Sequence, residues 1–273
     1  MARKILLIFA IATVVFLSFQ PYPFGQGFLV IMSCLTVLWL LSLYLKDSSI
    51  IDIFWGTGFV IVAWFYREKL GLSDIKSLIY CILITIWGLR LSIYLAFRNI
   101  GHGEDYRYQE WRKQYKNNWW WVSFLRVFLL QGVLLWIISS VFVPAIANQN
   151  ISFSILDYLG ILLWIIGLSF EAIGDWQLLQ FKKNPVNKGK VLQTGFWALT
   201  RHPNYFGDAL LWWGYFLFAC SNEGYIYIFS PLLMSFLLMR VSGVTLLEKK
   251  LVETKSQYAE YIKTVPAFFP KLF

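Results

Sequence analysis

Cysteine and histidine are scarce in this chain of 273 residues, which contains 3 cysteines and 2 histidines. Cys34, Cys81 and Cys220 are scattered through apolar stretches, without the CxxC or CxxH spacing that would support a disulfide framework or a zinc site. Two histidines are too few for a histidine-rich metal centre in a membrane. We therefore expect no metal ion, and cysteine usage leaves the redox compartment open.

Charged side chains are also few, at 14% of the chain against about 25% in soluble domains. Hydrophobic residues make up 58%, and the mean hydropathy is +0.59. The sequence therefore predicts an integral membrane protein. Lysine and arginine outnumber acidic residues by 24 to 15, but they lie in short loops between apolar runs rather than along one amphipathic face. That placement indicates membrane topology and not a nucleic-acid partner.

Long apolar runs predict an all-α fold, a polytopic membrane helix bundle of seven to eight transmembrane helices. A membrane-spanning helix needs roughly 20 apolar residues. Such runs lie near residues 4–20, 27–46, 50–67, 76–98, 121–146, 156–182, 207–220 and 225–243. The first run has the basic flank of a signal peptide, but no small-x-small cleavage site follows, so we expect it to be retained. The seventh is short, which predicts a tilted, re-entrant or internally packed helix.

Basic residues alternate between loops, as the positive-inside rule expects. Under eight spans the inner side would hold the tail and these residues: Arg3, Lys4, Lys46, Arg98, Arg107, Arg112, Lys113, Lys116, Lys182, Lys183, Lys188, Lys190 and Arg201. Loops 21–26, 147–155 and 221–224 carry no lysine or arginine, whereas loop 67–76 is an exception. We expect one integral membrane domain over residues 1–273, with both termini cytoplasmic. The amphipathic tail, residues 244–273, is expected at the inner surface.

Two predicted spans carry ordered polar stripes, although a charged side chain near the bilayer centre costs at least about 2.5 kcal/mol. Helical spacing places Trp87, Arg90, Tyr94 and Arg98 on one face of the fourth span, and Glu171, Asp175 and Lys182 on one face of the sixth, beside Gly160 and Gly167. One interpretation is an interhelical salt bridge between Arg90 and Glu171 or Asp175. The other is a cavity open to the cytosol that holds a polar cofactor.

The segment "TRHPNYFGD", residues 200–208, is a polar island between apolar runs. Its proline is placed where a first helical residue is favoured, and a helix N-terminus attracts anions. Arg201 would add a planar donor for phosphate, and His202 belongs to the same predicted site. The hydrogen-bonding candidates for the rest of a nucleotide are Asn204, Tyr205 and Asp208. The alternative is a plain loop-to-helix boundary with a positive-inside arginine.

Five segments carry a family resemblance, in order from about residue 48 to the end. They are "SIIDIFWGTGF", "WGLRLSIYLAFRNIGHGEDYRYQEW", "FEAIGDWQ", "GFWALTRHPNYFGD" and "YAEYIKTVPAFFP". Together they resemble the uncharacterised bacterial-type branch of the steroid 5-alpha-reductase-like membrane family. The motif "RHPNYFG" alone is less specific, because sterol reductases and isoprenylcysteine and phospholipid methyltransferases carry a similar one.

The resemblance implies an NADPH-dependent enzyme that reduces a carbon–carbon double bond conjugated to a carbonyl in a lipophilic, steroid- or isoprenoid-like substrate. The substrate would enter from the bilayer and the cofactor from the cytosol, at the bacterial inner membrane. Residues 87–273 would form the cofactor half. Oligomeric state is not indicated.

The resemblance also assigns residues. Glu171 and Asp175 match positions that hydrogen-bond the nicotinamide–ribose end, and Asn204 and Asp208 match polar contacts near the "PNYxG" turn. Arg90, Tyr94 and Arg98 fall on the cofactor-facing helix. Reductases with known steroid substrates usually show Asn at the position of Glu171 and Glu at the position of Asp208, which leaves substrate and cofactor identity open.

Reduction of an enone also needs an acid that polarises the carbonyl oxygen. Asp52 is the carboxyl candidate, by rough correspondence with the family's second-helix acid, and Tyr94 is the hydroxyl candidate. For Asp52 the alternative is a capping box with Ser49 at a helix start. Arg107 is a candidate for the 2′-phosphate of NADPH.

The segments around that arginine have plainer interpretations. We interpret Glu104 and Arg112 as a solvated charged loop, and "NNWWWV", residues 117–122, as an interfacial aromatic belt.

Two other functions remain open. The tail, with Arg240, Glu248, Tyr258 and Tyr261, also resembles the membrane methyltransferases, which use S-adenosylmethionine. The acidic pair on the sixth span favours the reductase, because those methyltransferases do not ordinarily show an ExxxD pair there. A non-enzymatic scaffold would need no ordered polar stripe.

Overall fold

A computed structural model describes residues 23–271, except 148–151, 242 and 256. The described residues are helical and form two compact units, Met1–Ile151 (unit 1) and Ser152–Phe273 (unit 2), each described by itself. Five described helical stretches are long and apolar enough to cross a membrane: Phe24–Leu45, Ile50–Lys69, Ile75–Asn99, Tyr106–Ile146 and Ile155–Lys183. The chain is therefore an integral membrane protein. The predicted first span, 4–20, lies outside the described residues, and a total of seven to eight stays a prediction.

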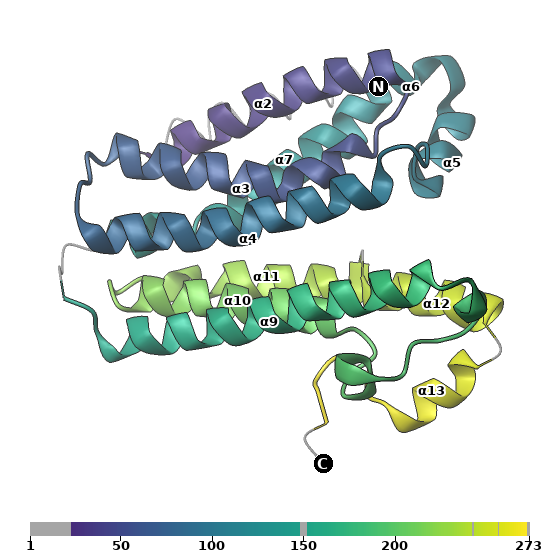
Figure 1. Cartoon of the computed structure of the whole chain (residues 1–273). Coiled ribbons are helices and arrows are strands. Elements are labelled where there is room, and N and C mark those ends of the chain that lie inside the picture. Colours follow the sequence, from purple (N-terminus) through teal and green to yellow (C-terminus); the bar gives the residue numbers. More distant parts are fainter. Residues whose placement is uncertain (1–22, 148–151, 242, 256, 272–273) are drawn as a thin grey trace. The chain divides into compact units, whose positions relative to one another are not determined.

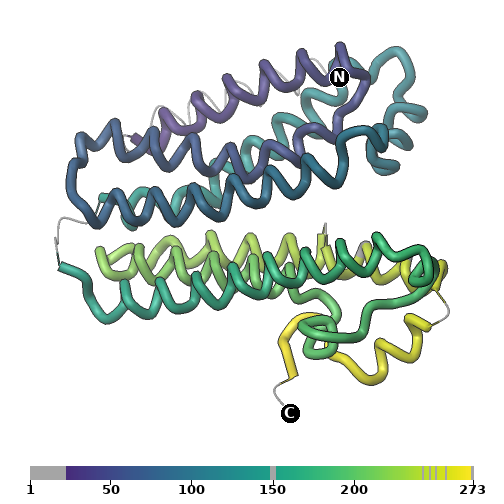
Figure 2. Tube along the Cα trace, in the orientation of Figure 1, coloured from purple at the N-terminus to yellow at the C-terminus, as the bar shows by residue number. Residues whose placement is uncertain are grey.

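Unit 1 is a bundle in which α2, α3, α4 and α7 run side by side (Figures 1 and 2). Its elements are α2 (Phe24–Leu45), α3 (Ile50–Lys69), α4 (Ile75–Asn99), α5 (Tyr106–Tyr115), η1 (Lys116–Asn118), α6 (Trp119–Ser123), η2 (Phe124–Leu129), α7 (Leu130–Ser139) and α8 (Phe142–Ile146). The predicted 121–146 span is thus a chain of shorter pieces that includes a π-helical turn, η2. The polar α5 lies at one end of the bundle.

Glycines set the spacing of the central helix pair of unit 1. A Cβ atom built on Gly56 of α3 would lie 2.0 Å from the carbonyl oxygen of Gly88 on α4. Because neither residue has a side chain, the two backbones touch. Ser92 Oγ then accepts hydrogen bonds from the backbone N–H and the hydroxyl of Thr57, both at 2.9 Å. The close approach therefore fixes the register of α3 against α4.

In unit 2, α9, α10 and α11 run side by side, and α13 lies at one end of them (Figures 1 and 2). Its elements are α9 (Ile155–Lys183), η3 (Pro185–Asn187), η4 (Gly195–Ala198), α10 (Pro203–Cys220), η5 (Tyr225–Ile228), α11 (Phe229–Phe236), η6 (Leu237–Val241), α12 (Val244–Thr254) and α13 (Tyr258–Thr264). A capping box starts α9: Ser154 Oγ accepts from the Asp157 N–H, and the Asp157 carboxylate accepts from the Ser154 N–H. These mutual bonds satisfy two backbone donors at the helix start.

The short seventh helix of the sequence prediction is α10, which begins at Pro203 as the proline predicted. Twelve of its 18 residues are buried, against seven of the 29 residues of α9. Of the three predicted alternatives, internal packing is therefore the one that unit 2 shows. The outer surface of α9 instead exposes Ile165, Ile173 and Trp176.

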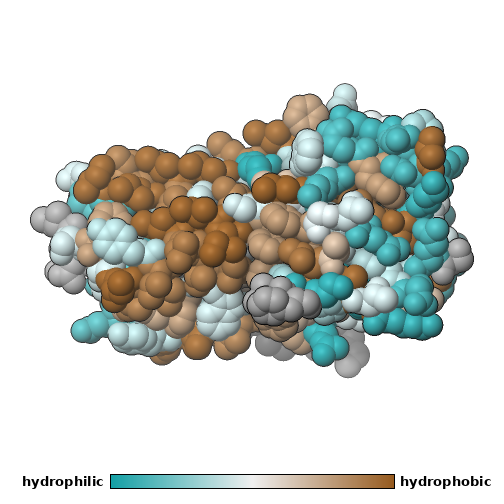
Figure 3. Space-filling view, turned by 60° about the horizontal axis from the view of Figure 1, so that its bottom comes forward, coloured by the Kyte–Doolittle hydropathy of each residue, from teal (hydrophilic) through white to brown (hydrophobic). Residues whose placement is uncertain are grey.

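Exposed hydrophobic side chains are a general feature of this chain, as expected for a protein solvated by lipid. In the space-filling view they cover a broad stretch of surface, whereas hydrophilic side chains gather toward one end (Figure 3). Such a division matches a hydrocarbon-facing surface bordered by an aqueous one.

Candidate functional site

The interface of α9 and α10 in unit 2 is held by glycines at matching positions. A Cβ atom on Gly167 would lie 2.6 Å from the carbonyl oxygen of Gly207, and one on Gly207 would lie 2.4 Å from that of Gly167. Gly160, seven residues before Gly167 on α9, makes the same contact with Gly214, seven residues after Gly207 on α10, as expected for antiparallel helices. The helices are thus close enough for short polar side chains to meet across them.

Four predicted cofactor residues lie on these facing helices. Glu171 and Asp175 follow Gly167 on α9, and their exposures are 3% and 4%. Asp208, 8% exposed, follows Gly207 on α10, and the backbone of Glu171 lies against Gly207. Asn204 Nδ2 donates to Asp175 Oδ1 at 3.0 Å. The acidic residues of the predicted stripe on the sixth span and the predicted island are therefore brought together at the corner of unit 2 where the second half of α9 faces the start of α10.

The chemistry of this corner follows from its acceptors. Carboxylates accept hydrogen bonds from hydroxyl, amide and ammonium groups, and they repel phosphate. Asn204 can both donate and accept, and its Oδ1 accepts from the Tyr205 N–H at 3.1 Å. This corner therefore suits the ribose hydroxyls and carboxamide of a nucleotide better than its phosphates. Within the described residues, no group of three or more histidine, cysteine or acidic side chains is arranged to hold a metal ion.

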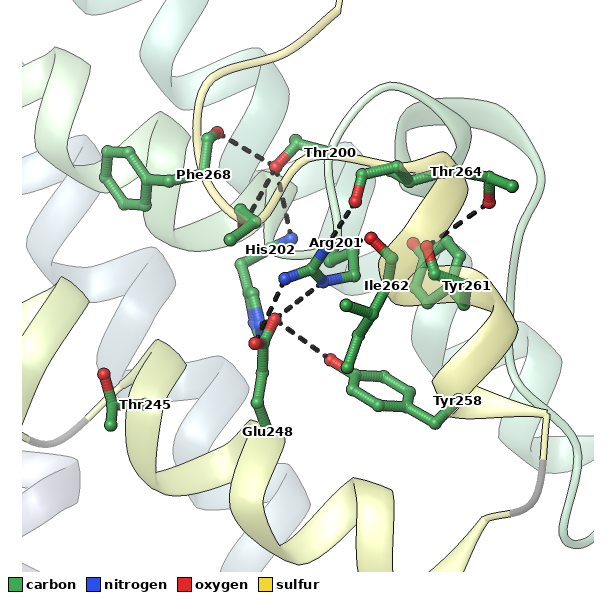
Figure 4. Close-up of polar contacts among 12 residues, drawn as sticks. Thr200, Arg201, His202, Thr245, Glu248, Tyr258, Tyr261, Ile262, Thr264 and Phe268 are labelled. Carbon is green, nitrogen blue, oxygen red and sulfur yellow. Dashed lines mark hydrogen bonds and ion pairs between the residues drawn. The ribbon is translucent and has the colours of Figure 1, made fainter.

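A second polar cluster joins the island to the C-terminal tail (Figure 4). Arg201 Nε donates to Glu248 Oε1 at 2.7 Å and Nη2 donates to Oε2 at 3.1 Å, a bidentate pair. His202 Nε2 and Tyr258 Oη approach Glu248 Oε1 at 3.1 and 3.3 Å. The Arg201 Nη1 group donates to the carbonyls of Ile262 and Val265. In this arrangement the Arg201 guanidinium binds protein acceptors on α12 and in the tail, and its predicted contact with a cofactor phosphate stays a prediction.

Backbone bonds fasten the same junction. The Arg201 N–H donates to the Pro266 carbonyl at 2.9 Å. The Thr200 hydroxyl donates to the Phe268 carbonyl at 2.9 Å. Trp197 Nε1 donates to the Gly174 carbonyl of α9 at 3.0 Å, and Tyr261 Oη donates to the Trp197 carbonyl. The tail is therefore a structural part of the corner where α9 ends and α10 begins.

Glu248 belongs to α12, outside the candidate membrane spans of the described residues. Burial raises the pKa of Glu248, but hydrogen bonds from His202 and Arg201 outweigh burial, and the result is a pKa of about 2. Since the folded-state pKa lies below the unfolded value, the carboxylate stabilises the fold above about pH 5 and this stabilisation is lost as pH falls toward 2. After discounting for partial solvation we expect a loss of about 2 kcal/mol.

This pH dependence can be measured by unfolding the detergent-solubilised chain between pH 7 and pH 3. The Glu248→Gln variant should be less stable at pH 7 and should show a flatter profile across that range. An acid profile unchanged by the substitution would contradict the role given to Glu248.

Unit 1 contains its own polar cluster at the start of α3. Arg107 Nη2 donates to Asp52 Oδ2 at 2.9 Å, and Tyr108 Oη donates to Asp52 Oδ1 at 2.8 Å. Gln131 Nε2 donates to Tyr108 Oη at 3.2 Å, and Trp55 Nε1 donates to Gln131 Oε1. The hydrogen bonds from Trp55 through Gln131 and Tyr108 all run toward Asp52, so the Asp52 carboxylate is the last acceptor of this series.

This geometry corrects two expectations about unit 1. The capping box of Ser49 and Asp52 was wrong: Ser49 makes no side-chain cap and its hydroxyl donates to Asp47. Asp52 instead binds Arg107 and Tyr108 of α5. The solvated interpretation of Glu104 and Arg112 was also wrong, since Arg112 Nε and Nη2 each donate to Glu104 at 2.8 Å. Glu104 also accepts from the Ser48 N–H, so the loop is tied to the α2–α3 corner.

The remaining predicted site residues are divided between the two units. On α4, the Arg98 guanidinium lies 5.7 Å from the centre of the Tyr94 ring, with Arg90 one turn before Tyr94. In unit 2, Lys182 and Arg240 are exposed, at the end of α9 and in η6. The convergence of the α4 stripe with the α9 stripe stays a prediction, as does the salt bridge of Arg90 with Glu171 or Asp175. The ring of Tyr205 stacks on His202, with centroids 5.6 Å apart.

Sequence reasoning missed several members of these clusters. Tyr108 lies in the "GEDYRY" segment, and its position next to Arg107 gave no sign that both side chains reach Asp52. Gln131 is a single polar residue in an apolar run, which is a usable signal because polar groups in spans seek partners. Glu248, Tyr258 and Tyr261 were noted only for their likeness to methyltransferases. Thr200 carried no signal.

Comparison with known proteins identifies the family. The chain is 25% identical to the "Uncharacterized protein C594.04c" of Schizosaccharomyces pombe over 93% of this chain and 81% of that protein. It is 44% identical, over 46 residues, to the "Probable O-methyltransferase ustE" of Ustilaginoidea virens, which covers 17% of this chain and 16% of that one. No solved structure matches. Residues 38–265 match the family described as "Protein of unknown function (DUF1295)".

The family match covers most of the chain and contains all the site residues predicted above. The bacterial-type branch stays a prediction, since the long match is to a fungal protein. The chain thus belongs to the DUF1295 family, which is in general terms the steroid 5-alpha-reductase-like family.

Proposed function

We propose that this chain is a membrane oxidoreductase that uses NADPH to reduce a carbon–carbon double bond conjugated to a carbonyl in a lipophilic substrate. The observation that supports it is the corner of α9 and α10. There Glu171 and Asp175, which the resemblance assigns to the nicotinamide–ribose end, lie on the helix that faces Asn204 and Asp208, which it assigns to polar contacts near the "PNYxG" turn. Asn204 is bonded to Asp175. Their acceptors suit ribose hydroxyls and a carboxamide.

The reaction divides into two parts. NADPH would supply a hydride to one carbon of the double bond, and a proton must reach the other while the carbonyl oxygen is stabilised as negative charge develops. For the acid, Asp52 and Tyr94 remain the predicted residues. Within unit 1 both oxygens of the Asp52 carboxyl accept hydrogen bonds, from Arg107 and Tyr108. Tyr108 joins Tyr94 as a hydroxyl candidate.

A second candidate is an S-adenosylmethionine-dependent membrane methyltransferase. It is favoured by the 46-residue likeness to a probable O-methyltransferase. The binding of Glu248 to the "RHP" segment gives this tail a defined place beside the corner. A carboxylate-lined corner would also suit the ribose and the cationic groups of S-adenosylmethionine.

Ligand-induced thermal stabilisation separates the two functions. We expect NADPH to raise the melting temperature of the detergent-solubilised chain, since a ligand at 100 times its Kd adds about 2.7 kcal/mol of stability. NADH should act less strongly, and S-adenosylmethionine should have no effect. Stabilisation by S-adenosylmethionine alone would overturn the reductase proposal and establish the second candidate.

A charge-neutralising variant tests whether the nucleotide binds at the corner of α9 and α10. Asp175→Asn keeps the shape of the side chain but removes its charge, and we expect it to weaken NADPH binding about tenfold. The matched control is Glu260→Gln, which neutralises an exposed carboxylate of α13 and should leave binding unchanged. Equal affinity in both variants would mean that the nucleotide binds elsewhere.

A further inference from the structure

Arg126 occupies the boundary between polar and apolar sequence in unit 1. Residues 127–146 contain no Asp, Glu, Lys or Arg. A helix of that length is about 30 Å long, which equals the thickness of the hydrocarbon core. The residues before it, in α5 and η1, are strongly polar. Arg126 therefore lies where headgroups meet hydrocarbon, in the π-helical turn η2.

Aromatic side chains hold the guanidinium of Arg126 in place. It lies 5.1 Å from the centre of the Trp111 ring and 5.4 Å from that of Tyr115, and its Nη1 donates to Tyr115 Oη. Tyr115 in turn stacks on Trp119 with centroids 6.4 Å apart. Cation–π contacts of this kind orient a guanidinium while leaving its remaining N–H groups available.

Arg112 provides an internal comparison. It lies 5.6 Å from the centre of the Trp119 ring, on the same group of aromatic residues, but both its Nε and Nη2 bind Glu104. Arg126 has no such carboxylate among the residues that the structure describes. The Arg126 side chain is also exposed. Among the described residues, Arg126 is thus an exposed guanidinium that two aromatic rings orient and that no carboxylate binds.

We propose that Trp111, Tyr115 and Arg126 form a binding site for the phosphate of an anionic phospholipid headgroup. Arginine presents a planar set of donors that matches phosphate geometry. Tryptophan and tyrosine are the side chains favoured at the level of lipid headgroups. The exposed side chains of Trp120 and Leu130 flank the site and would contact the acyl region. A net negative headgroup is selected because it adds a charge attraction that a zwitterionic one lacks.

The site is tested by lipid binding to the full chain in detergent. Phosphatidylglycerol and phosphatidylcholine with identical acyl chains are titrated, and bound lipid is counted by native mass spectrometry. We expect preferential retention of phosphatidylglycerol, and Arg126→Gln should weaken it roughly fivefold, the loss typical for one basic residue at an anionic surface. Lys113→Gln, which removes an exposed cation of α5 without aromatic contacts, is the matched control and should change affinity less than about twofold.

Three results would overturn the proposal: equal retention of both lipids, equal affinity in Arg126→Gln and the native chain, or displacement of phosphatidylglycerol by millimolar inorganic phosphate, which would indicate a site for soluble anions. The melting temperature in lipid-free detergent is measured alongside. If Arg126→Gln lowers it, affinity is compared in Arg126→Lys, which keeps the charge and loses the planar donor set. Unchanged phosphatidylglycerol binding there would also count against the site.

Discussion

Arg201→Met is expected to destabilise unit 2 by about 3 to 5 kcal/mol, the cost of removing one partner from a buried ion pair. Arg201 is 6% exposed, and its loss leaves the Glu248 carboxylate, within the described part of the chain, with His202 and Tyr258 as partners. It also removes the donors to the Ile262 and Val265 carbonyls, which hold the tail. Thermal unfolding in detergent measures the first effect. Limited trypsin digestion near Lys255 and Lys263 measures release of the tail.

A double-mutant cycle separates the ion pair from general damage. Glu248→Leu removes the charge that Arg201→Met leaves behind, so the double variant should be more stable than the sum of the single losses predicts. Glu260→Gln, on an exposed ion pair with Lys263, should cost less than about 1 kcal/mol. If Arg201→Met cost no more than this control, the cluster would not hold the tail.

Gly167→Ala is expected to destabilise unit 2 by about 3 kcal/mol, at the upper end for overpacked sites. The added Cβ would lie 2.6 Å from the Gly207 carbonyl oxygen and 2.7 Å from the Leu211 nitrogen, and neither backbone atom can rotate away. The helices must therefore separate, which weakens the bond between Asn204 and Asp175 further along the interface. We expect a lower melting temperature and weaker nucleotide binding together.

Gly174→Ala is the control on the same helix. Its Cβ would lie 3.1 Å from Pro203 Cγ, a contact that a small shift relieves, and alanine is the better helix former by about 1 kcal/mol. We expect little change in stability. Equal losses at the two glycines would contradict the role given to the close approach of Gly167 to Gly207, because only the Gly167 variant presses on backbone atoms that cannot rotate away.

The elements of this fold were largely predictable because they depend on local patterns. Apolar runs placed α2, α3, α4 and α9 to within a few residues, and the proline of the island marked the first residue of α10. The 121–146 run was predicted as one span and lies within the single helical stretch Tyr106–Ile146, but a π-helical turn that carries Arg126 interrupts its α-helical geometry. A hydropathy pattern cannot distinguish a π-helical turn from an α-helical one, because both can be built from the same apolar residues.

Side-chain partners were harder to predict. The i, i+4 spacing of Glu171 with Asp175, and of Asn204 with Asp208, placed each pair on one helical face. It did not show that Asn204 would bond Asp175 or that Arg201 would bind Glu248, 47 residues away. For Asp52 the local pattern favoured a cap, and a residue 55 positions away proved to be the partner.

The sequence by itself determined that this chain is helical, lies in a membrane, and carries polar groups where lipid excludes them, because these properties follow from composition and from the period of a helix. Only the tertiary structure decided which polar groups meet. Contacts between distant residues depend on how closely two backbones approach. At Gly167 and Gly207 the backbones of α9 and α10 approach closely because neither residue has a side chain. No local pattern encodes it.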